Sequence, residues 1–263
     1  MRLARVALAP GEPPPRHPLD DESAFVELDG DVGHVLSLAP WLGGVRTGLT
    51  VPVRERRAYP PVDPPKILCV GRNYAAHAKE MGNEVPAEPL LFLKPHSALL
   101  APGGTIVLPR ESAKVEHEAE LAVVIGKRAR NVSAADALSY VYGYTAAGDI
   151  SARDLQKSDG QWSRAKGFDG FCPVGPVVET ALDPRDLGIA CRVNGATRQD
   201  GRTSQMVFPV AELVAYASRM MTLEPGDLIL TGTPSGVGPI TPGDRLEIEI
   251  EGIGVLACDV SAP

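Results

Sequence analysis

The chain has 263 residues, with 26 lysines and arginines against 33 aspartates and glutamates, which gives a formal net charge of −7. This acidic balance argues against binding to nucleic acid or to an anionic lipid surface. No apolar run reaches the roughly 18 residues that a membrane span needs. The four cysteines lie far apart without a C-x-x-C pair, so we expect free, buried thiols and a cytoplasmic protein.

Short strand-like runs separated by Gly, Pro, Asn and Asp predict a mainly β protein of the α+β class. Residues 1–62 are predicted to form a small β-rich domain, because a proline cluster at 60–65 separates them from the rest. Residues 63–263 form the predicted main domain. Within it we expect strands at 66–70, 90–94, 105–108, 115–126, 142–150, 228–234 and 245–252, a hairpin turn at 194–195, and helices at 74–81 and 209–221.

Three carboxylates form the pattern that points most directly to chemistry. Glu118 and Glu120 share one face if residues 115–126 form a strand, and Asp149 ends another strand 29 residues after Glu120. Carboxylates without a partnering Cys or His pair suit a hard cation, Mg²⁺ above all, with Mn²⁺ or Ca²⁺ as alternatives. A solvated strand face is the simpler interpretation, but the apolar run that follows Glu120 favours burial.

A second pair lies on the predicted helix at 74–81. His77 and Glu80 are three residues apart and can touch, so the carboxylate would orient the imidazole as a general base acting on water. Without further context, an exposed helical pair of little energetic consequence is the simpler interpretation.

Three more polar residues are candidates for anion binding. Lys166 would neutralise a substrate carboxylate or a developing oxyanion, with a surface lysine as the alternative. Arg72 opens the helix that carries His77 and would bind a carboxylate. Thr233 belongs to a Thr-Gly-Thr-Pro segment whose hydroxyls and amides would surround an anionic oxygen, or which forms only a turn.

Taken in order, these segments resemble the fumarylacetoacetate hydrolase family. The resemblance runs from about residue 66 to the C-terminus. It rests on residues 70–74 with 77 and 80, 91–95, 118–121, 148–149 with 152–154 and 156, 166, 194–195, 205–206, 230–234 and 236–238.

The resemblance implies a fold of rolled antiparallel β-sheet with few short helices, usually as a homodimer. It implies that Glu118, Glu120 and Asp149 bind Mg²⁺ or Mn²⁺, and that the helix with His77 and Glu80 is a lid. Lys166, Gln156 and Thr233 would then contact the substrate or its oxyanion.

The implied function is that of a metal-dependent enzyme acting on a 2-oxo or 2-hydroxy-diene dicarboxylic acid, or on an acylpyruvate, through a metal-bound enolate in aromatic catabolism. A 2-hydroxyhepta-2,4-diene-1,7-dioate isomerase or decarboxylase is the leading reading. An acylpyruvate (fumarylpyruvate) hydrolase and an oxaloacetate decarboxylase are the alternatives, and a non-catalytic β-rich scaffold is a remote one.

Overall fold

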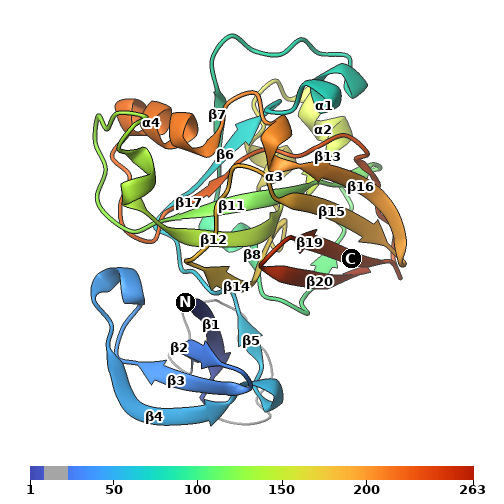
Figure 1. Ribbon diagram of the computed structural model, residues 1–263. Helices are drawn as coiled ribbons and strands as arrows, with labels where there is room; N and C mark the ends of the chain where they lie inside the picture. The colour runs from blue at the N-terminus through green and yellow to red at the C-terminus, as the bar shows by residue number, and fades with distance from the viewer. Residues whose placement is uncertain (9–22) are drawn as a thin grey trace.

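The structure is a computed structural model that describes residues 1–8 and 23–263. Its described part is built mainly from strands in three sheets (Figure 1). The largest sheet has 12 strands: β1 (Arg2–Ala7), β2 (Ser23–Asp29), β3 (Val32–Leu36), β4 (Arg46–Pro52), β5 (Ala58–Tyr59), β6 (Ile67–Gly71), β7 (Leu90–Lys94), β8 (Leu99–Leu100), β11 (Ala119–Ile125), β12 (Val141–Gly148), β14 (Cys172–Glu179) and β17 (Leu228–Leu230).

Two smaller sheets, four α-helices and five short 3₁₀ helices make up the rest of the regular structure in the described residues. The three-stranded sheet contains β10 (Val115–His117), β13 (Ser151–Ala152) and β18 (Gly238–Pro239). The five-stranded sheet contains β9 (Thr105–Val107), β15 (Gly188–Val193), β16 (Ala196–Arg202), β19 (Arg245–Ile250) and β20 (Gly254–Ser261). The helices are α1 (Ala75–Glu80), α2 (Arg153–Ser158), α3 (Ser163–Lys166) and α4 (Val210–Met220).

The predicted fold class is confirmed, with one addition. Most neighbouring strands are antiparallel, but β6 pairs with β17, β8 with β14 and β9 with β20 in parallel. The turn at Asn194 and Gly195 joins β15 to β16, with φ of 53° and 78° at these two residues. All four cysteines are buried and free, as predicted. None of the helices in the described residues has the length and apolar content that a bilayer crossing requires.

The N-terminal strands continue the largest sheet. β1 pairs with β14 through Arg2 opposite Glu179 and Leu3 opposite Val178, and β2, β3 and β4 follow outward (Figure 1). The division at residue 62 stays a prediction, and residues 9–22 of that segment lie outside the described residues.

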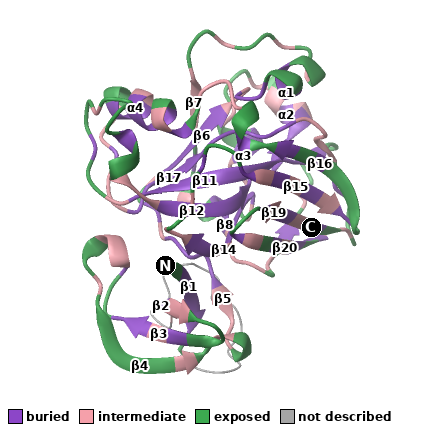
Figure 2. Cartoon of the chain, viewed as in Figure 1, coloured by how far each residue is buried: buried purple, intermediate pink, exposed green. Residues whose placement is uncertain are grey.

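Strand β11 runs through the centre of the largest sheet and is buried along its whole length (Figure 2). Its side chains alternate between two apolar clusters, with Leu121 and Val123 in one and Ala122 and Val124 in the other. A strand covered on both faces reads as a continuous apolar run. Glu120 lies in this strand, so the solvated face that the sequence left open is not what forms.

Asn73 ties three segments together next to helix α1. It is fully buried, and its side-chain amide donates to the carbonyls of Thr231 (2.8 Å) and Phe208 (3.0 Å). Its side-chain oxygen accepts a hydrogen bond from the Phe208 N–H (2.8 Å). The start of the helix that carries His77 is thereby fixed against the end of β17.

We expect Asn73→Ala to lower the free energy of unfolding by about 1–3 kcal/mol, because buried backbone groups lose their partners. Urea unfolding measures this change. Asn83→Ala is the control, because its side-chain amide makes a local bond to the Met81 carbonyl (3.1 Å). Equal losses in the two variants would contradict the anchoring role of Asn73.

Candidate active site

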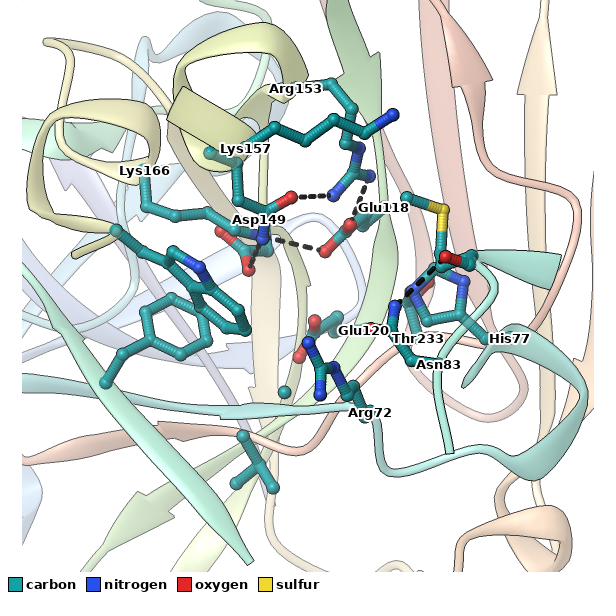
Figure 3. A pocket seen from close by; sticks show the side chains of 16 residues that line it. Arg72, His77, Asn83, Glu118, Glu120, Asp149, Arg153, Lys157, Lys166 and Thr233 are labelled. Carbon is teal, nitrogen blue, oxygen red and sulfur yellow. Dashed lines mark hydrogen bonds and ion pairs between the residues drawn. The ribbon is translucent and has the colours of Figure 1, made fainter. Parts of the chain in front are cut away.

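A cavity of about 230 Å³ lies where β6, β11 and α1 meet the segment after β17. Its walls contain predicted site residues from seven separate stretches of the chain (Figure 3). These are Arg72, His77, Glu118, Glu120, Asp149, Gln156, Lys166 and Thr233. The predicted site residue Glu80 does not line the cavity, and its carboxylate contacts His77 Nδ1.

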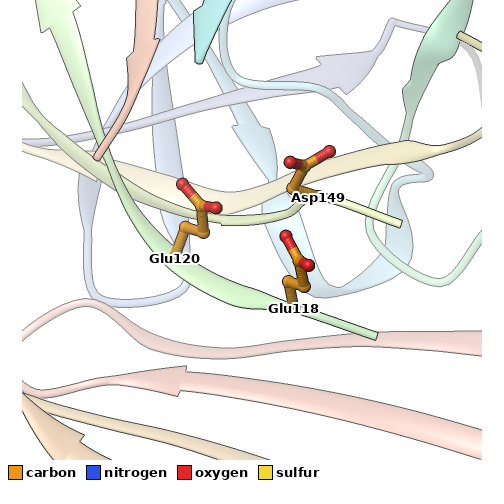
Figure 4. A group of neighbouring side chains, drawn as sticks. All are labelled: Glu118, Glu120 and Asp149. Carbon is orange, nitrogen blue, oxygen red and sulfur yellow. The ribbon is translucent and has the colours of Figure 1, made fainter. Parts of the chain in front are cut away.

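The three carboxylates of Glu118, Glu120 and Asp149 are buried and point toward one another (Figure 4). One oxygen from each lies within 4.8 Å of the others. Glu118 stands between β10 and β11, and Asp149 follows the last residue of β12. The Asp149 N–H donates to the Glu118 carbonyl (3.0 Å), so the backbone itself holds these two carboxylates together.

Positively charged side chains contact two of the three carboxylates. Lys94 donates to Asp149 Oδ1 (2.6 Å), and Lys166 donates both to Asp149 Oδ2 and to Glu118 Oε2 (3.0 Å). Arg153 donates to Glu118 Oε1. Each of these cations is itself buried. Buried Lys and Arg require such partners, so Lys166 is not the surface lysine that the sequence left open.

Glu120 has different contacts from Glu118 and Asp149. It accepts a hydrogen bond from the Gly232 N–H (2.6 Å), and within the described residues it has no ion-pair partner. Burial, with the charges of Asp149 and Glu118, raises the pKa of Glu120 well above its ordinary value. Burial also acts to raise the pKa of Glu118, but the charges of Lys166 and Arg153 outweigh it and lower that pKa.

The cluster fits a divalent cation on these grounds. Three carboxylate oxygens at close spacing are the donors that Mg²⁺, Mn²⁺ and Ca²⁺ prefer. A buried carboxylate without a cationic partner is costly unless it is protonated or bound to a cation. The structure therefore brings the predicted ligand set together in a site suited to a divalent metal.

His77 and Glu80 form the pair that the spacing predicts. His77 Nδ1 lies 3.2 Å from Glu80 Oε2, and Glu80 Oε1 accepts a hydrogen bond from the Gly236 N–H (2.9 Å). His77 is buried, whereas the Glu80 side chain is 33% exposed. The carboxylate thus holds both the imidazole of α1 and the backbone that follows Thr233.

Two side chains that were predicted to contact the substrate, Gln156 and Thr233, form hydrogen bonds within the protein. Gln156 Oε1 accepts from Arg153 Nη1 (2.6 Å), and the Thr233 hydroxyl donates to the Ala119 carbonyl (2.8 Å).

Arg72 has a left-handed backbone, with φ of 58°, directly after the last residue of β6. Non-glycine residues at positive φ are uncommon and often occur at functional sites.

The sequence reasoning missed several residues of the site. Arg153 and Lys94 hold the carboxylates, and Asn83, Lys157 and Trp162 line the cavity (Figure 3). Lys94 carried a usable signal, because it ends an apolar strand and a lysine there needs a buried acidic partner. Arg153 lies in the 152–154 segment on which the family resemblance rests, but no role was predicted for it. Asn83, Lys157 and Trp162 lie in loops and short helices without a distinctive pattern.

Comparison with known proteins connects this site to named enzymes. The profile of the fumarylacetoacetate (FAA) hydrolase C-terminal domain matches residues 66–261. The solved 2-hydroxyhepta-2,4-diene-1,7-dioate isomerase from Mycobacterium marinum is 44% identical, with a TM-score of 0.87, over 100% of this chain and 98% of that one. Fumarylpyruvate hydrolase from Pseudomonas aeruginosa, solved with Mn²⁺ and pyruvate, is 36% identical, with a TM-score of 0.72, over 79% of this chain and 92% of that one.

A sequence relative carries a third activity. The mitochondrial oxaloacetate tautomerase of Bos taurus is 47% identical over 209 residues, which cover 75% of this chain and 67% of that protein. A chain with this β-rich fold, and with a buried carboxylate cluster beside a short helix, thus falls in a class of enzymes whose members catalyse different reactions. The chain is a member of the fumarylacetoacetate hydrolase family, and the predicted resemblance is confirmed.

The raised pKa of Glu120 makes cation binding depend on pH. In the ion-free protein Glu120 keeps its proton above the ordinary glutamate range, and a cation must displace that proton. We expect Mn²⁺ affinity to rise with pH, by about tenfold per pH unit while Glu120 remains protonated. Calorimetry in buffers of different ionisation enthalpy measures the protons released.

Glu116→Gln is the matched control for this titration. Although burial acts to raise the pKa of Glu116, hydrogen bonds from Lys114 and Arg153 lower it, so this carboxyl is already ionised. The variant should keep the pH dependence. An Mn²⁺ affinity that does not change with pH in the unaltered protein would contradict the protonation of Glu120.

Proposed function

We propose that the protein is a divalent-metal-dependent enzyme that isomerises or decarboxylates a 2-hydroxy-diene or 2-oxo dicarboxylic acid in aromatic catabolism. The supporting observation is that one small cavity contains both the carboxylate cluster and the imidazole of His77. When bound to Glu118, Glu120 and Asp149, the ion would act as a Lewis acid that stabilises negative charge developing beside the 2-oxo group.

The size and charge of the cavity support a small anionic substrate. Its volume of about 230 Å³ lies below the roughly 300–1,000 Å³ typical of sites for drug-sized ligands. Arg72 and Lys157 both line it, and within the described residues neither has an ion-pair partner. These two cations are suited to bind a substrate carboxylate distant from the metal.

His77 is suited to move a proton at the substrate. Nδ1 faces the Glu80 carboxylate, which leaves Nε2 as the nitrogen that can accept a proton. Glu80 stabilises the charged imidazole that results, and its contact with the Gly236 N–H holds it in place. In isomerisation of a 2-hydroxy-diene the enol oxygen loses a proton and a substrate carbon gains one, and His77 would carry that proton.

Hydrolysis of an acylpyruvate is the second candidate. Here His77 would take a proton from water, which then attacks the distal carbonyl and releases pyruvate. The preformed contact between His77 and Glu80 favours this role, because a water-activating base must be oriented in advance. The similarity to the Pseudomonas aeruginosa hydrolase supports it as well. Oxaloacetate decarboxylation would require no nucleophile.

The reaction is tested with Mg²⁺ and a panel of a 2-hydroxy-2,4-dienedioate, an acylpyruvate, fumarylpyruvate and oxaloacetate. Pyruvate, CO₂ and the ultraviolet band of the enol are followed together. CO₂ or a moving enol band without cleavage supports the proposed reaction. Release of pyruvate together with a free acid would assign hydrolysis instead. If no substrate undergoes an EDTA-sensitive change, the non-catalytic β-rich scaffold is favoured.

We expect Glu118→Gln to abolish Mn²⁺ binding and turnover of every substrate while the fold remains intact, because the cluster loses a charged ligand. Circular dichroism checks the fold, and steady-state assays with added metal check the activity. Unchanged turnover would show that the cluster is not the catalytic centre.

Replacing His77 by Ala separates the two candidate reactions. If His77 activates water, His77→Ala should reduce hydrolysis by about 10²–10⁴-fold and reduce enol–keto tautomerisation much less. If both reactions fall equally, His77 transfers protons in each of them. His34→Ala is the control, since His34 lies in β3 at the N-terminal end of the largest sheet.

A further inference from the structure

Gln199, in strand β16, is fully buried beside the carboxylate cluster. Its Oε1 accepts a hydrogen bond from the Ala119 N–H (3.0 Å). Its Nε2 donates to the Thr233 hydroxyl oxygen (2.7 Å) and to the Pro234 carbonyl (2.8 Å). Both ends of the amide are therefore used, which is how a buried glutamine avoids a desolvation penalty.

The contacts of Gln199 close into a cycle. The Thr233 hydroxyl accepts from Gln199 and donates its proton to the Ala119 carbonyl (2.8 Å). The N–H and the carbonyl of Ala119 are thus both held, one by Gln199 and the other by Thr233. Since a hydroxyl has one proton to donate, that of Thr233 is committed to Ala119 and not to a substrate oxygen.

His117 packs against the Gln199 amide, whose orientation is fixed by the backbone groups on either side of it. Its Nδ1 lies 3.1 Å from Gln199 Oε1 and 3.3 Å from Cys191 Sγ, and its ring is fully buried. The Ala119 N–H can only donate, so the amide oxygen must face Ala119 and Nε2 must face Thr233 and Pro234. The orientation of the amide is therefore set by its surroundings.

The held residue, Ala119, stands between Glu118 and Glu120. In an extended backbone the Glu118 and Glu120 side chains leave on the same side, opposite to that of Ala119. The orientation of the Ala119 backbone between them therefore decides where the two carboxylates point. Gln199 itself belongs to the five-stranded sheet, whereas Ala119 belongs to β11 of the largest sheet. The Gln199 amide is thus a polar link between two sheets at the position where the spacing of the cluster is set.

We propose that Gln199 is a positioning residue for the metal. Together with Thr233 it holds the Ala119 backbone so that the carboxylates of Glu118 and Glu120 keep the spacing a divalent cation needs. This inference rests on the proposed function, because it requires that the cluster bind a metal. It assigns the Thr233 hydroxyl to the same task.

The first test is Gln199→Met, which keeps the length of the side chain but removes every hydrogen bond. Mn²⁺ affinity is measured without substrate, from the electron paramagnetic resonance signal of free Mn²⁺. Loss of a residue that orients metal ligands costs roughly 10–100-fold in affinity, and we expect a loss in that range. Affinity equal to that of the unaltered protein would overturn the proposal.

Thr203→Val controls for general destabilisation. The Thr203 hydroxyl is buried, accepts a hydrogen bond from the Leu187 N–H (2.8 Å), and is not on the cavity wall. The variant loses a buried hydrogen bond close to β16 but leaves Ala119 untouched, so its Mn²⁺ affinity should not change. A loss equal to that of Gln199→Met would show that destabilisation alone explains the effect.

Thr233 supplies a second test that does not depend on whether Gln199→Met folds. Thr233→Val removes the hydroxyl with little change of shape, and we expect Mn²⁺ affinity to fall by roughly 10–100-fold. Thr233→Ser keeps the hydroxyl and should restore the affinity. A Thr233 that contacted only the substrate would leave metal affinity unchanged in both variants, which would overturn the assignment.

Asp149→Asn separates this inference from the function on which it rests. If Asp149→Asn abolishes Mn²⁺ binding while the Gln199 and Thr233 variants keep it, the metal site stands and the positioning role fails. If Asp149→Asn binds Mn²⁺ as the unaltered protein does, the cluster is not the metal site, and the proposed function fails with the inference.

Discussion

The burial of three carboxyl groups at one point is the constraint on which the rest of the site depends. Glu118, Glu120 and Asp149 place oxygens within 4.8 Å of one another, in an interior where charges are weakly screened. Lys94, Lys166 and Arg153 neutralise two of them, and Glu120 is left with a backbone N–H. This asymmetry leaves the cluster short of positive charge at Glu120, where a divalent cation would supply it.

The sheets provide the rigidity that such a cluster requires. β11 is buried on both faces, so Glu120 cannot turn toward solvent, and the backbone bond from Asp149 to Glu118 joins the ends of two strands. His77, the proposed base, lies in contrast on a helix of six residues. A rigid carboxylate cluster beside a short helical element suits a family whose members perform isomerisation, hydrolysis and tautomerisation, since loops can vary while the sheets stay fixed.

Much of the fold and of the site could be predicted from local pattern. The spacing of Glu118 and Glu120 before an apolar run indicated a buried strand, and the spacing of His77 and Glu80 indicated their contact. Apart from Asp149, which was predicted to join Glu118 and Glu120, the partners distant in sequence could not be predicted. Arg153 meets Glu118 across 35 residues, and Gln199 meets Ala119 across 80, through contacts that exist only once the sheets have packed. A lone glutamine in a polar stretch gives no sign of this beforehand.

Anomalous X-ray diffraction at the manganese edge, from crystals grown with Mn²⁺ and oxalate, tests directly whether the three carboxylates bind a divalent cation. Oxalate offers two adjacent carboxylate oxygens, as a 2-oxo acid offers its carboxylate and keto oxygens, but it cannot react. We expect an anomalous peak between Glu118, Glu120 and Asp149, with oxalate in the cavity beside His77. A peak elsewhere, or an unchanged cluster in which Lys166 still bridges Glu118 and Asp149 without an ion, would show that this cluster is not the metal site.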